Sequence, residues 1–181
     1  MKKIVLTFGL ISGAIMAALM LGNVAIVDKI GFDRGLVVGY TVIVLSFLLV
    51  FFGIRSYREN VGGGYITFGR AFSVGILIVL ISSLVYVLTW EFEYQKWFYD
   101  FPEKYSNYAI EKARASGASP EQIARETEEM NSMWALYRSS FLVRAAFTFI
   151  EPFPVGLLMT PIFAAILRRR PKEVPAETAP V

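Results

Sequence analysis

The stretch AFSVGILIVLISSLVYVLTW, residues 71–90, decides the fold, because it runs for its whole length without a charged side chain. A helix needs about 20 mainly apolar residues to cross the hydrocarbon core of a bilayer. The apolar residues follow one another without alternation, which favours a spanning helix over a strand of a transmembrane barrel. A helix also satisfies its backbone hydrogen bonds internally, as lipid requires. We therefore predict a membrane span over 71–90.

Three further apolar stretches accompany it. Residues 4–27 and 36–54 carry no charge, and residues 145–167 carry one acid, Glu151. Only 18% of the chain is charged and 55% is hydrophobic, whereas a soluble domain carries about 25% charged residues. This composition excludes an ordinary soluble enzyme domain. We predict an all-α integral membrane four-helix bundle, a single membrane domain over 1–170, followed by a disordered cytoplasmic tail over 171–181.

The first stretch has a second interpretation. Lys2 and Lys3 followed by an apolar run resemble a secretory signal peptide. The run is long for such a peptide, and the best cleavage point, after Ala25, has Asn23 where a small residue is required. We interpret residues 4–27 as a retained first span.

The chain has no cysteine and no histidine. Thiol nucleophiles, disulfides, Cys/His zinc sites and a histidine base are therefore excluded. No pair of catalytic groups stands within the predicted spans, so we expect no enzyme activity, no cofactor and no metal. The basic residues stand at the ends of apolar stretches and not on one face with interleaved aromatic residues, so we expect no nucleic-acid partner.

Charge at the ends of the spans predicts their orientation. Segments 1–3, 55–70 and 168–181 hold nine basic and three acidic residues, whereas segments 28–35 and 91–144 hold nine basic and eleven acidic ones. Positive residues favour the cytoplasmic side. We expect both termini in the cytoplasm of a bacterial cell. An aromatic belt just past the third span agrees with this, and it comprises Trp90, Tyr94, Trp97 and Tyr99.

The predicted inner loops carry arginines suited to anionic headgroups or to orientation alone. These arginines are Arg55, Arg58, Arg70, Arg168, Arg169 and Arg170. In the loop over 55–70, Gly62, Gly63 and Gly64 permit positive φ, and we predict a simple chain reversal there. The expected partners are membrane lipids, together with a second copy of the chain or another membrane protein.

The segment 91–144 is the only sizeable part outside the predicted spans. Pro102 can open one helix, and Ser119, Pro120 and Gln122 form the start signal of a second. We predict an extracytoplasmic helical hairpin over about 102–138. A semi-apolar stripe on its second helix is expected to pack on the first helix or on the bundle mouth, and it comprises Ile123, Thr127, Met130, Trp134 and Tyr137. The alternative is a docking face for another protein. Successive helix positions point different ways, so the acids Glu126, Glu128 and Glu129 are expected to form a solvated face.

Small residues recur every four positions in the apolar stretches, a spacing that lets helices approach closely in lipid. It favours either a compact bundle or a homo-oligomer. The glycines expected at such contacts are Gly9, Gly13, Gly39, Gly75 and Gly156.

Glu151 is the one acid within a predicted span, and its meaning depends on its depth. Pro152 and Pro154 follow it, so a fresh helix can begin at Pro152 after an interfacial helix over 141–150. Glu151 would then help to satisfy the exposed amides at the break. The alternative makes Glu151 a proton or cation site beside a broken helix, with Arg144 as its counter-charge.

Several motifs together resemble a bacterial membrane-protein family called domain of unknown function 4199. The resemblance runs from about Lys3 to Arg170 and is most specific in the stretch GIRSYR, residues 53–58. The other matching motifs are residues 66–72 with Gly75, 101–105, 116–119, 153–158 and Arg168-Arg169. It implies four spans in the bacterial cytoplasmic membrane and no assigned activity, cofactor or catalytic residue.

Together these features predict a non-enzymatic structural or interaction component of the bacterial cytoplasmic membrane. The alternative is a small transporter or channel subunit that uses Glu151 as a proton or cation site. An intramembrane enzyme is the least favoured interpretation.

Overall fold

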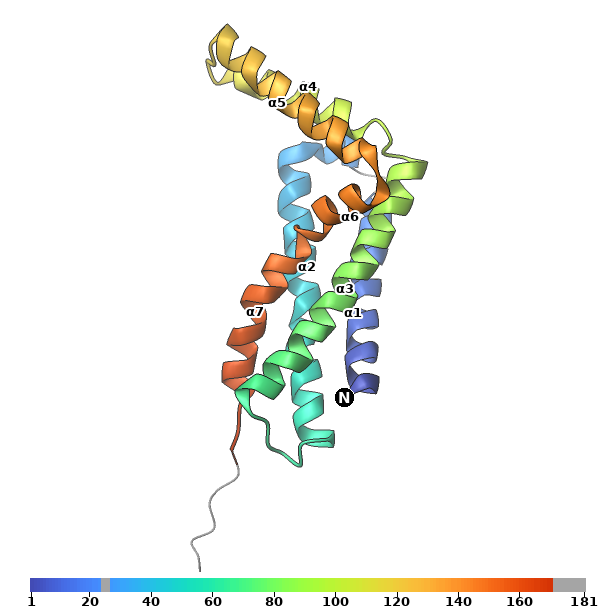
Figure 1. Cartoon of the computed structure of the whole chain (residues 1–181), viewed down its shortest axis with the longest axis vertical. Helices are drawn as coiled ribbons and strands as arrows, with labels where there is room; N and C mark the ends of the chain where they lie inside the picture. Colours follow the sequence, from blue (N-terminus) through green and yellow to red (C-terminus); the bar gives the residue numbers. More distant parts are fainter. Residues whose placement is uncertain (24–26, 171–181) are drawn as a thin grey trace, which may run out of the picture.

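The computed structural model describes residues 1–23 and 27–170, and these residues form helices joined by short connections (Figure 1). Within them, four helical segments are long and apolar enough to cross a membrane: Lys2–Gly22, Lys29–Asn60, Phe68–Lys96 and Phe141–Leu167. These apolar helices suggest a membrane protein. The tail predicted over 171–181 lies outside the described residues.

Helix α3 (Phe68–Lys96) is the centre of the bundle. It packs on α1 (Lys2–Asn23), on α2 (Val27–Asn60) and on α7 (Pro152–Leu167), as Figure 1 shows. The side chains between these helices are apolar and fully buried. They include Met16, Phe47, Val50, Ile54, Val74, Ile78, Val79 and Ala164.

Glycines set the spacing between α1 and α3. A methyl group built on Gly9 would lie 2.8 Å from the Cβ atom of Ile81, and one built on Gly13 would lie 2.7 Å from the Cβ atom of Val85. Contacts this short leave room for a hydrogen atom only. The two helix backbones therefore approach closely along this pair of glycines, the geometry that small residues permit in membranes.

Glycines also set the spacing between α3 and α7. A methyl group on Gly75 would lie 2.7 Å from Cγ2 of Thr160, and one on Gly156 would lie 2.4 Å from Cγ1 of Val79. Gly39 differs from the expectation, because a methyl group there would meet no atom within 4 Å. Among residues 1–23 and 27–170, no other helix packs closely on α2 at Gly39.

The helices extend beyond the apolar stretches that predict them. Residues 28–35, which lie between two of the predicted spans, belong to α2, which is interrupted only at Gly31 with φ 74°. At the other end α2 continues to Asn60 before the chain turns. A helix tolerates polar residues once it leaves the apolar layer, so hydropathy marks the apolar layer and not the helix ends.

The fourth segment is broken, as the prolines predict. Helix α6 (Phe141–Phe149) is followed by Ile150 and Glu151, and α7 begins at Pro152. Sixteen residues of α7 correspond to about 24 Å of helix at 1.5 Å per residue. This length is shorter than the roughly 30 Å hydrocarbon core.

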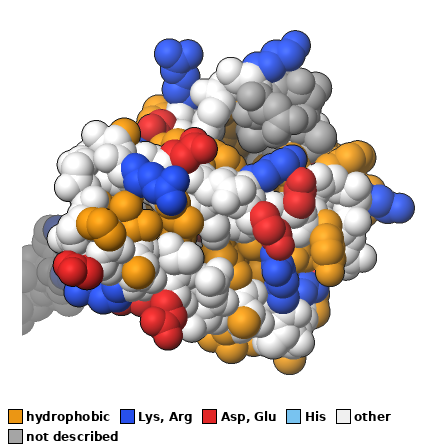
Figure 2. Space-filling view, turned by 90° about the horizontal axis from the view of Figure 1, so that it is seen from above, with side chains coloured by type: hydrophobic (Ala, Val, Ile, Leu, Met, Phe, Trp, Pro, Cys, Tyr) orange, Lys and Arg blue, Asp and Glu red, His pale blue; other side chains and the backbone are white. Residues whose placement is uncertain are grey.

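Helices α4 (Phe101–Ala115) and α5 (Pro120–Ser139) lie across one end of the bundle (Figure 1). Ser119 accepts from the Gln122 backbone amide and Gln122 accepts from that of Ser119, so the predicted capping box is present. Trp134 of the predicted stripe donates to the Ser106 hydroxyl on α4 at 2.9 Å. The stripe therefore packs on α4 at Trp134. Figure 2 shows acidic and basic side chains interspersed over the end of the molecule that carries α4 and α5.

An aromatic cluster joins α4 to the rest of the chain. The Phe32 ring of α2 packs on the rings of Phe101, Tyr105 and Tyr108, with centroids 5.0–6.0 Å apart. Beside it Lys112 donates to the Asp33 carboxylate at 2.7 Å, and this hydrogen bond raises the pKa of Lys112 above its usual value. The first turns of α2 are thus fastened to α4.

Candidate functional site

The polar groups of the bundle collect at the end that carries α4 and α5, called here the α4–α5 end. Helix α3 has 29 residues, or about 43 Å at 1.5 Å per residue, which exceeds the roughly 30 Å hydrocarbon core. Its last turns therefore pass beyond the apolar stretch 71–90 and carry Glu91, Glu93 and Gln95. Helix α6 and the α6–α7 break face these turns.

Arg144 of α6 forms a bidentate ion pair with Glu91 of α3. Its Nε donates to Glu91 Oε2 at 3.0 Å and its Nη2 to Glu91 Oε1 at 2.5 Å. Gln95 donates to the same carboxylate at 2.9 Å, and the guanidinium lies over the Tyr94 ring, 5.1 Å from its centroid. Paired planar contacts of this kind are strong and directional. They fix α6 against α3.

The expected pairing of Arg144 with Glu151 does not form. Glu151 instead accepts a hydrogen bond from the Tyr86 hydroxyl at 2.6 Å. Seven positions on a continuous helix would bring Arg144 and Glu151 onto one face, but the break at Ile150 ends α6 before Glu151. The side chain of Glu151 makes no capping hydrogen bond to α7, so the expected capping role is wrong as well.

Glu93 is the residue that sequence reasoning missed. Only 2% of its surface is exposed, and its Oε1 atom has no hydrogen-bond partner among the described residues. In the sequence it stands just past an apolar stretch, where an acid is normally solvated. The only signal available was its place two turns after Tyr86, on the same face of α3.

The acids of the described residues do not form a metal site. No group of three or more acidic side chains among residues 1–23 and 27–170 could hold a metal ion. Glu126, Glu128 and Glu129 are all exposed on α5, in agreement with the solvated face expected there.

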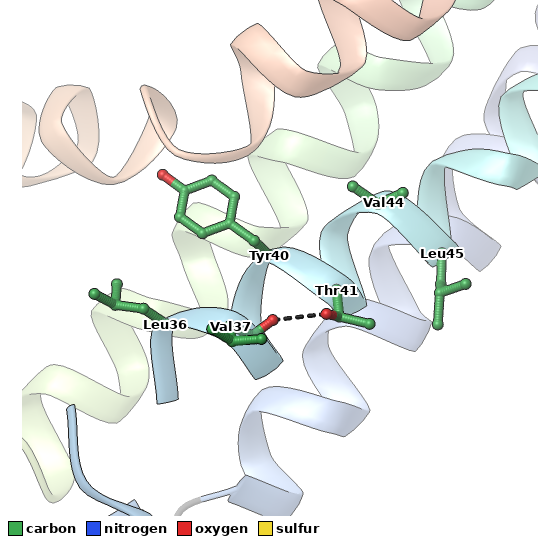
Figure 3. A pocket seen from close by; sticks show the side chains of 6 residues that line it. All are labelled: Leu36, Val37, Tyr40, Thr41, Val44 and Leu45. Carbon is green, nitrogen blue, oxygen red and sulfur yellow. Dashed lines mark hydrogen bonds between the residues drawn. The ribbon is translucent and has the colours of Figure 1, made fainter. Parts of the chain in front are cut away.

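Two hollows on the described residues lie away from Glu151. One, of about 490 Å³, is an open apolar depression along α2, lined by Leu36, Val37, Tyr40, Thr41, Val44 and Leu45 (Figure 3). The other, of about 370 Å³, is lined by Arg168 and Arg170 at the opposite end of the bundle.

The opposite end of the bundle, called here the arginine end, brings together the α2–α3 loop and the residues after α7. Ile66 and Arg169 exchange backbone hydrogen bonds of 3.0 and 2.9 Å in a single antiparallel bridge. Arg58 is half-buried and donates to the Leu167 carbonyl at 3.2 Å. The other five arginines named from the sequence are exposed: Arg55, Arg70, Arg168, Arg169 and Arg170.

The turn at Gly62, Gly63 and Gly64 in the same loop needs a backbone conformation and spacing that only glycine accommodates without strain. Gly63 and Gly64 have φ values of 59° and 86°, a region that residues with a Cβ atom avoid. A methyl group on Gly62 would lie 2.1 Å from the Tyr65 carbonyl oxygen. All three glycines are therefore required by the reversal itself.

The comparisons with known proteins identify a family and nothing more specific. The model of a family described as a protein of unknown function (DUF4199) matches residues 7–169. No curated protein matches the chain, and no solved structure matches it.

Proposed function

The chain belongs to the DUF4199 family of proteins of unknown function, and we propose that it is a non-enzymatic, multi-pass component of a bacterial cytoplasmic membrane. It works by packing with itself or with another membrane protein. One observation carries this proposal. The centre of the bundle is filled mainly by apolar side chains with no exposed surface, such as Phe47, Val74 and Ile78. The buried hydroxyls of Ser12, Ser82 and Thr160 donate to backbone carbonyl oxygens, and this core cluster contains no ionisable side chain among the described residues.

The outer surface of the helices supports the membrane part of the proposal. Large apolar side chains are exposed along α1, α2 and α7, among them Leu10, Val37 and Leu158. Contiguous apolar surface of this extent is rare on soluble monomers. Lipid tails are the environment in which it is stable.

The arginine end belongs on the cytoplasmic side in this proposal. The surplus of basic residues there supports that orientation, and it puts α4 and α5 outside the cytoplasm as a helical hairpin. The exposed arginines then lie at the height of anionic headgroups.

The orientation is tested with single cysteines, because the chain has none of its own. Val61→Cys lies in the α2–α3 loop and Ala115→Cys at the end of α4, and both positions are exposed. A membrane-impermeant maleimide applied to intact cells should label the second variant and not the first. Labelling of the first variant alone would contradict the proposed orientation.

The packing role is tested by disulfide cross-linking from α5. Leu136 is 54% exposed on this helix, so Leu136→Cys places a thiol on the free side of α5. Oxidation in native membranes should give an adduct with a second copy or with one defined partner, whereas Val61→Cys should give none. A chain that stays uncross-linked from every exposed position of α5 and behaves as a monomer would contradict this role.

A second candidate function, a small transporter or channel subunit, is favoured by the Tyr86–Glu151 hydrogen bond. This polar contact lies beside a proline-broken helix, an arrangement that transporters use for ion sites. Glu151→Gln would abolish proton-linked flux in vesicles if Glu151 carried a proton or cation. Unchanged flux with unchanged folding would exclude this function.

A further inference from the structure

Glu93 lies where a carboxylate is seldom found without a partner. It is 98% covered by the rest of the chain, since 2% of its surface is exposed. No salt bridge involves it among the described residues, and its Oε1 atom accepts no hydrogen bond from them. Acidic residues are almost never buried in this way unless they are paired.

Arg144, a cation that packs on the last turns of α3, is already engaged. Arg144 directs both of its bonded nitrogens to Glu91, which stands two positions before Glu93 on α3. The Tyr86 hydroxyl lies within electrostatic range of Glu93 but donates to Glu151. The titratable groups near Glu93 on the elements that meet here include Tyr40, Tyr86, Glu91, Tyr94, Lys96, Arg144 and Glu151, and Lys96 is exposed and forms no salt bridge with Glu93. None of them neutralises a negative charge on Glu93.

Glu93 also lies in the last turn of α3. The backbone amides of Trp97 and Phe98 both donate to its main-chain carbonyl oxygen, at 2.8 and 3.1 Å, and end the helix there. Because the side chain of Glu93 is buried, its ionised form would need the packing around it to open so that water could reach the carboxylate, whereas the neutral acid would not.

We propose that Glu93 is a proton-binding site, occupied while the α4–α5 end is packed and emptied only when that packing opens. The proton leaves the carboxyl group to water at this end of the bundle, and no other bond is made or broken. An unpaired buried carboxylate costs far more than a buried neutral acid, so proton binding and packing stabilise each other. This site stands independently of the function proposed above and of the Glu151 alternative.

The proposal is tested by infrared spectroscopy of the full chain in lipid nanodiscs. Ordinary glutamates ionise near pH 4.3, so at neutral pH a carbonyl band of a protonated carboxylic acid reports a perturbed one. We expect this band in the native chain, its loss in Glu93→Gln and its retention in Glu121→Gln, an exposed acid on α5. Absence of the band from the native chain would overturn the proposal. Loss in Glu151→Gln with retention in Glu93→Gln would also overturn it, because the proton would then reside on Glu151.

A stability measurement gives an independent readout. Because the folded state holds a proton that the unfolded state releases, the melting temperature of the native chain should fall as the pH rises above about 4.3, the pKa of an unperturbed glutamate, and should level off once Glu93 is ionised in the folded state as well. The amide of Glu93→Gln mimics the neutral acid, so this variant should fold and lose that dependence, while Glu121→Gln should keep it. Failure of Glu93→Gln to fold, or a pH dependence equal to that of the native chain, would contradict the proposal.

Discussion

Arg144 and Glu91 show how strongly the surroundings of an ion pair decide its effect. Their side chains are 14% and 11% exposed, and they join two helices from positions 53 residues apart in the sequence. Arg138 and Glu103 form a comparable contact between α5 and α4, but their side chains are 38% and 56% exposed. Solvent competes with the second pair much more than with the first.

Replacing Arg144 by Ala should therefore destabilise the chain far more than replacing Arg138 by Ala. The first change leaves Glu91 largely buried without its counter-charge, and we expect a loss of about 3 kcal/mol in the free energy of unfolding. The second removes an exposed pair, which contributes at most about 1 kcal/mol. Unfolding in mixed detergent micelles, followed by circular dichroism, measures both. Equal losses in the two variants would show that the Glu91 pair is no more shielded from water than its exposed counterpart.

Glycines act on the helices as whole elements, because each one sets the distance between two axes. Gly13 stands where α1 meets α3, whereas Gly39 stands on the uncovered part of α2. Both belong to small-residue repeats of the same spacing in the sequence. The two repeats therefore lie in different environments, one against a neighbouring helix and the other on the surface of the chain.

Gly13→Leu should destabilise the bundle, and Gly39→Leu should not. A side chain at position 13 collides with Val85, and overpacking of this kind costs about 1–3 kcal/mol. Position 39 offers open space, so the thermal stability of the monomer should be unchanged. Thermal unfolding and the molar mass in detergent are measured for both variants. A loss of oligomers in Gly39→Leu alone would place Gly39 in an interface between copies, and equal destabilisation would contradict the difference in packing.

The aromatic rings around Phe32 hold helix α4 as a whole on the bundle. Phe32→Ala removes three aromatic contacts at once, so the α4–α5 pair should detach more often. We expect trypsin to cleave the exposed Arg114 and Arg125 about tenfold faster, which corresponds to about 1.4 kcal/mol of local stability. Phe68→Ala, at the arginine end, is the matched control and should leave the cleavage rate unchanged. Unaltered cleavage in Phe32→Ala would show that other contacts hold α4 in place.

For the whole molecule, the sequence predicts which segments form the bundle better than it predicts which residues contact one another. Uninterrupted apolar stretches give the four candidate spans, and Pro152 gives the break in the last one, because both depend on local chemistry. The Arg144–Glu91 pair has no such signal. Its partners come from helices distant in the sequence, and the choice between Glu91 and Glu151 depends on how the break rotates α6 relative to α7.

Glu93 is a second case in which the sequence does not reveal the surroundings of a side chain. Hydropathy places it outside the apolar stretch, and its burial follows from tertiary packing, which no local pattern records. The uncovered state of Gly39 likewise depends on which face of α2 the neighbouring helices occupy. Residue spacing predicts that such groups share a face of a helix, but not what that face meets.

The medium around the whole molecule, water or lipid, decides how much a charge on its surface costs. Lysine substitutions on the surface therefore test the assignment to a membrane. Leu158 lies near the middle of α7 with 71% of its surface exposed, and Leu136 lies on α5 with 54% exposed. In water, lysine at either position would be harmless, because no other side chain would be displaced. In a bilayer, lysine at position 158 faces hydrocarbon, and insertion scales give a cost of about 2.5–3.5 kcal/mol at the centre of a spanning helix. Leu158→Lys should therefore reduce the amount of chain recovered in membranes and its melting temperature in nanodiscs, whereas Leu136→Lys should change neither. If both lysines were tolerated equally, the surface of α7 would face water, and the assignment of the four apolar helices to a membrane would be wrong.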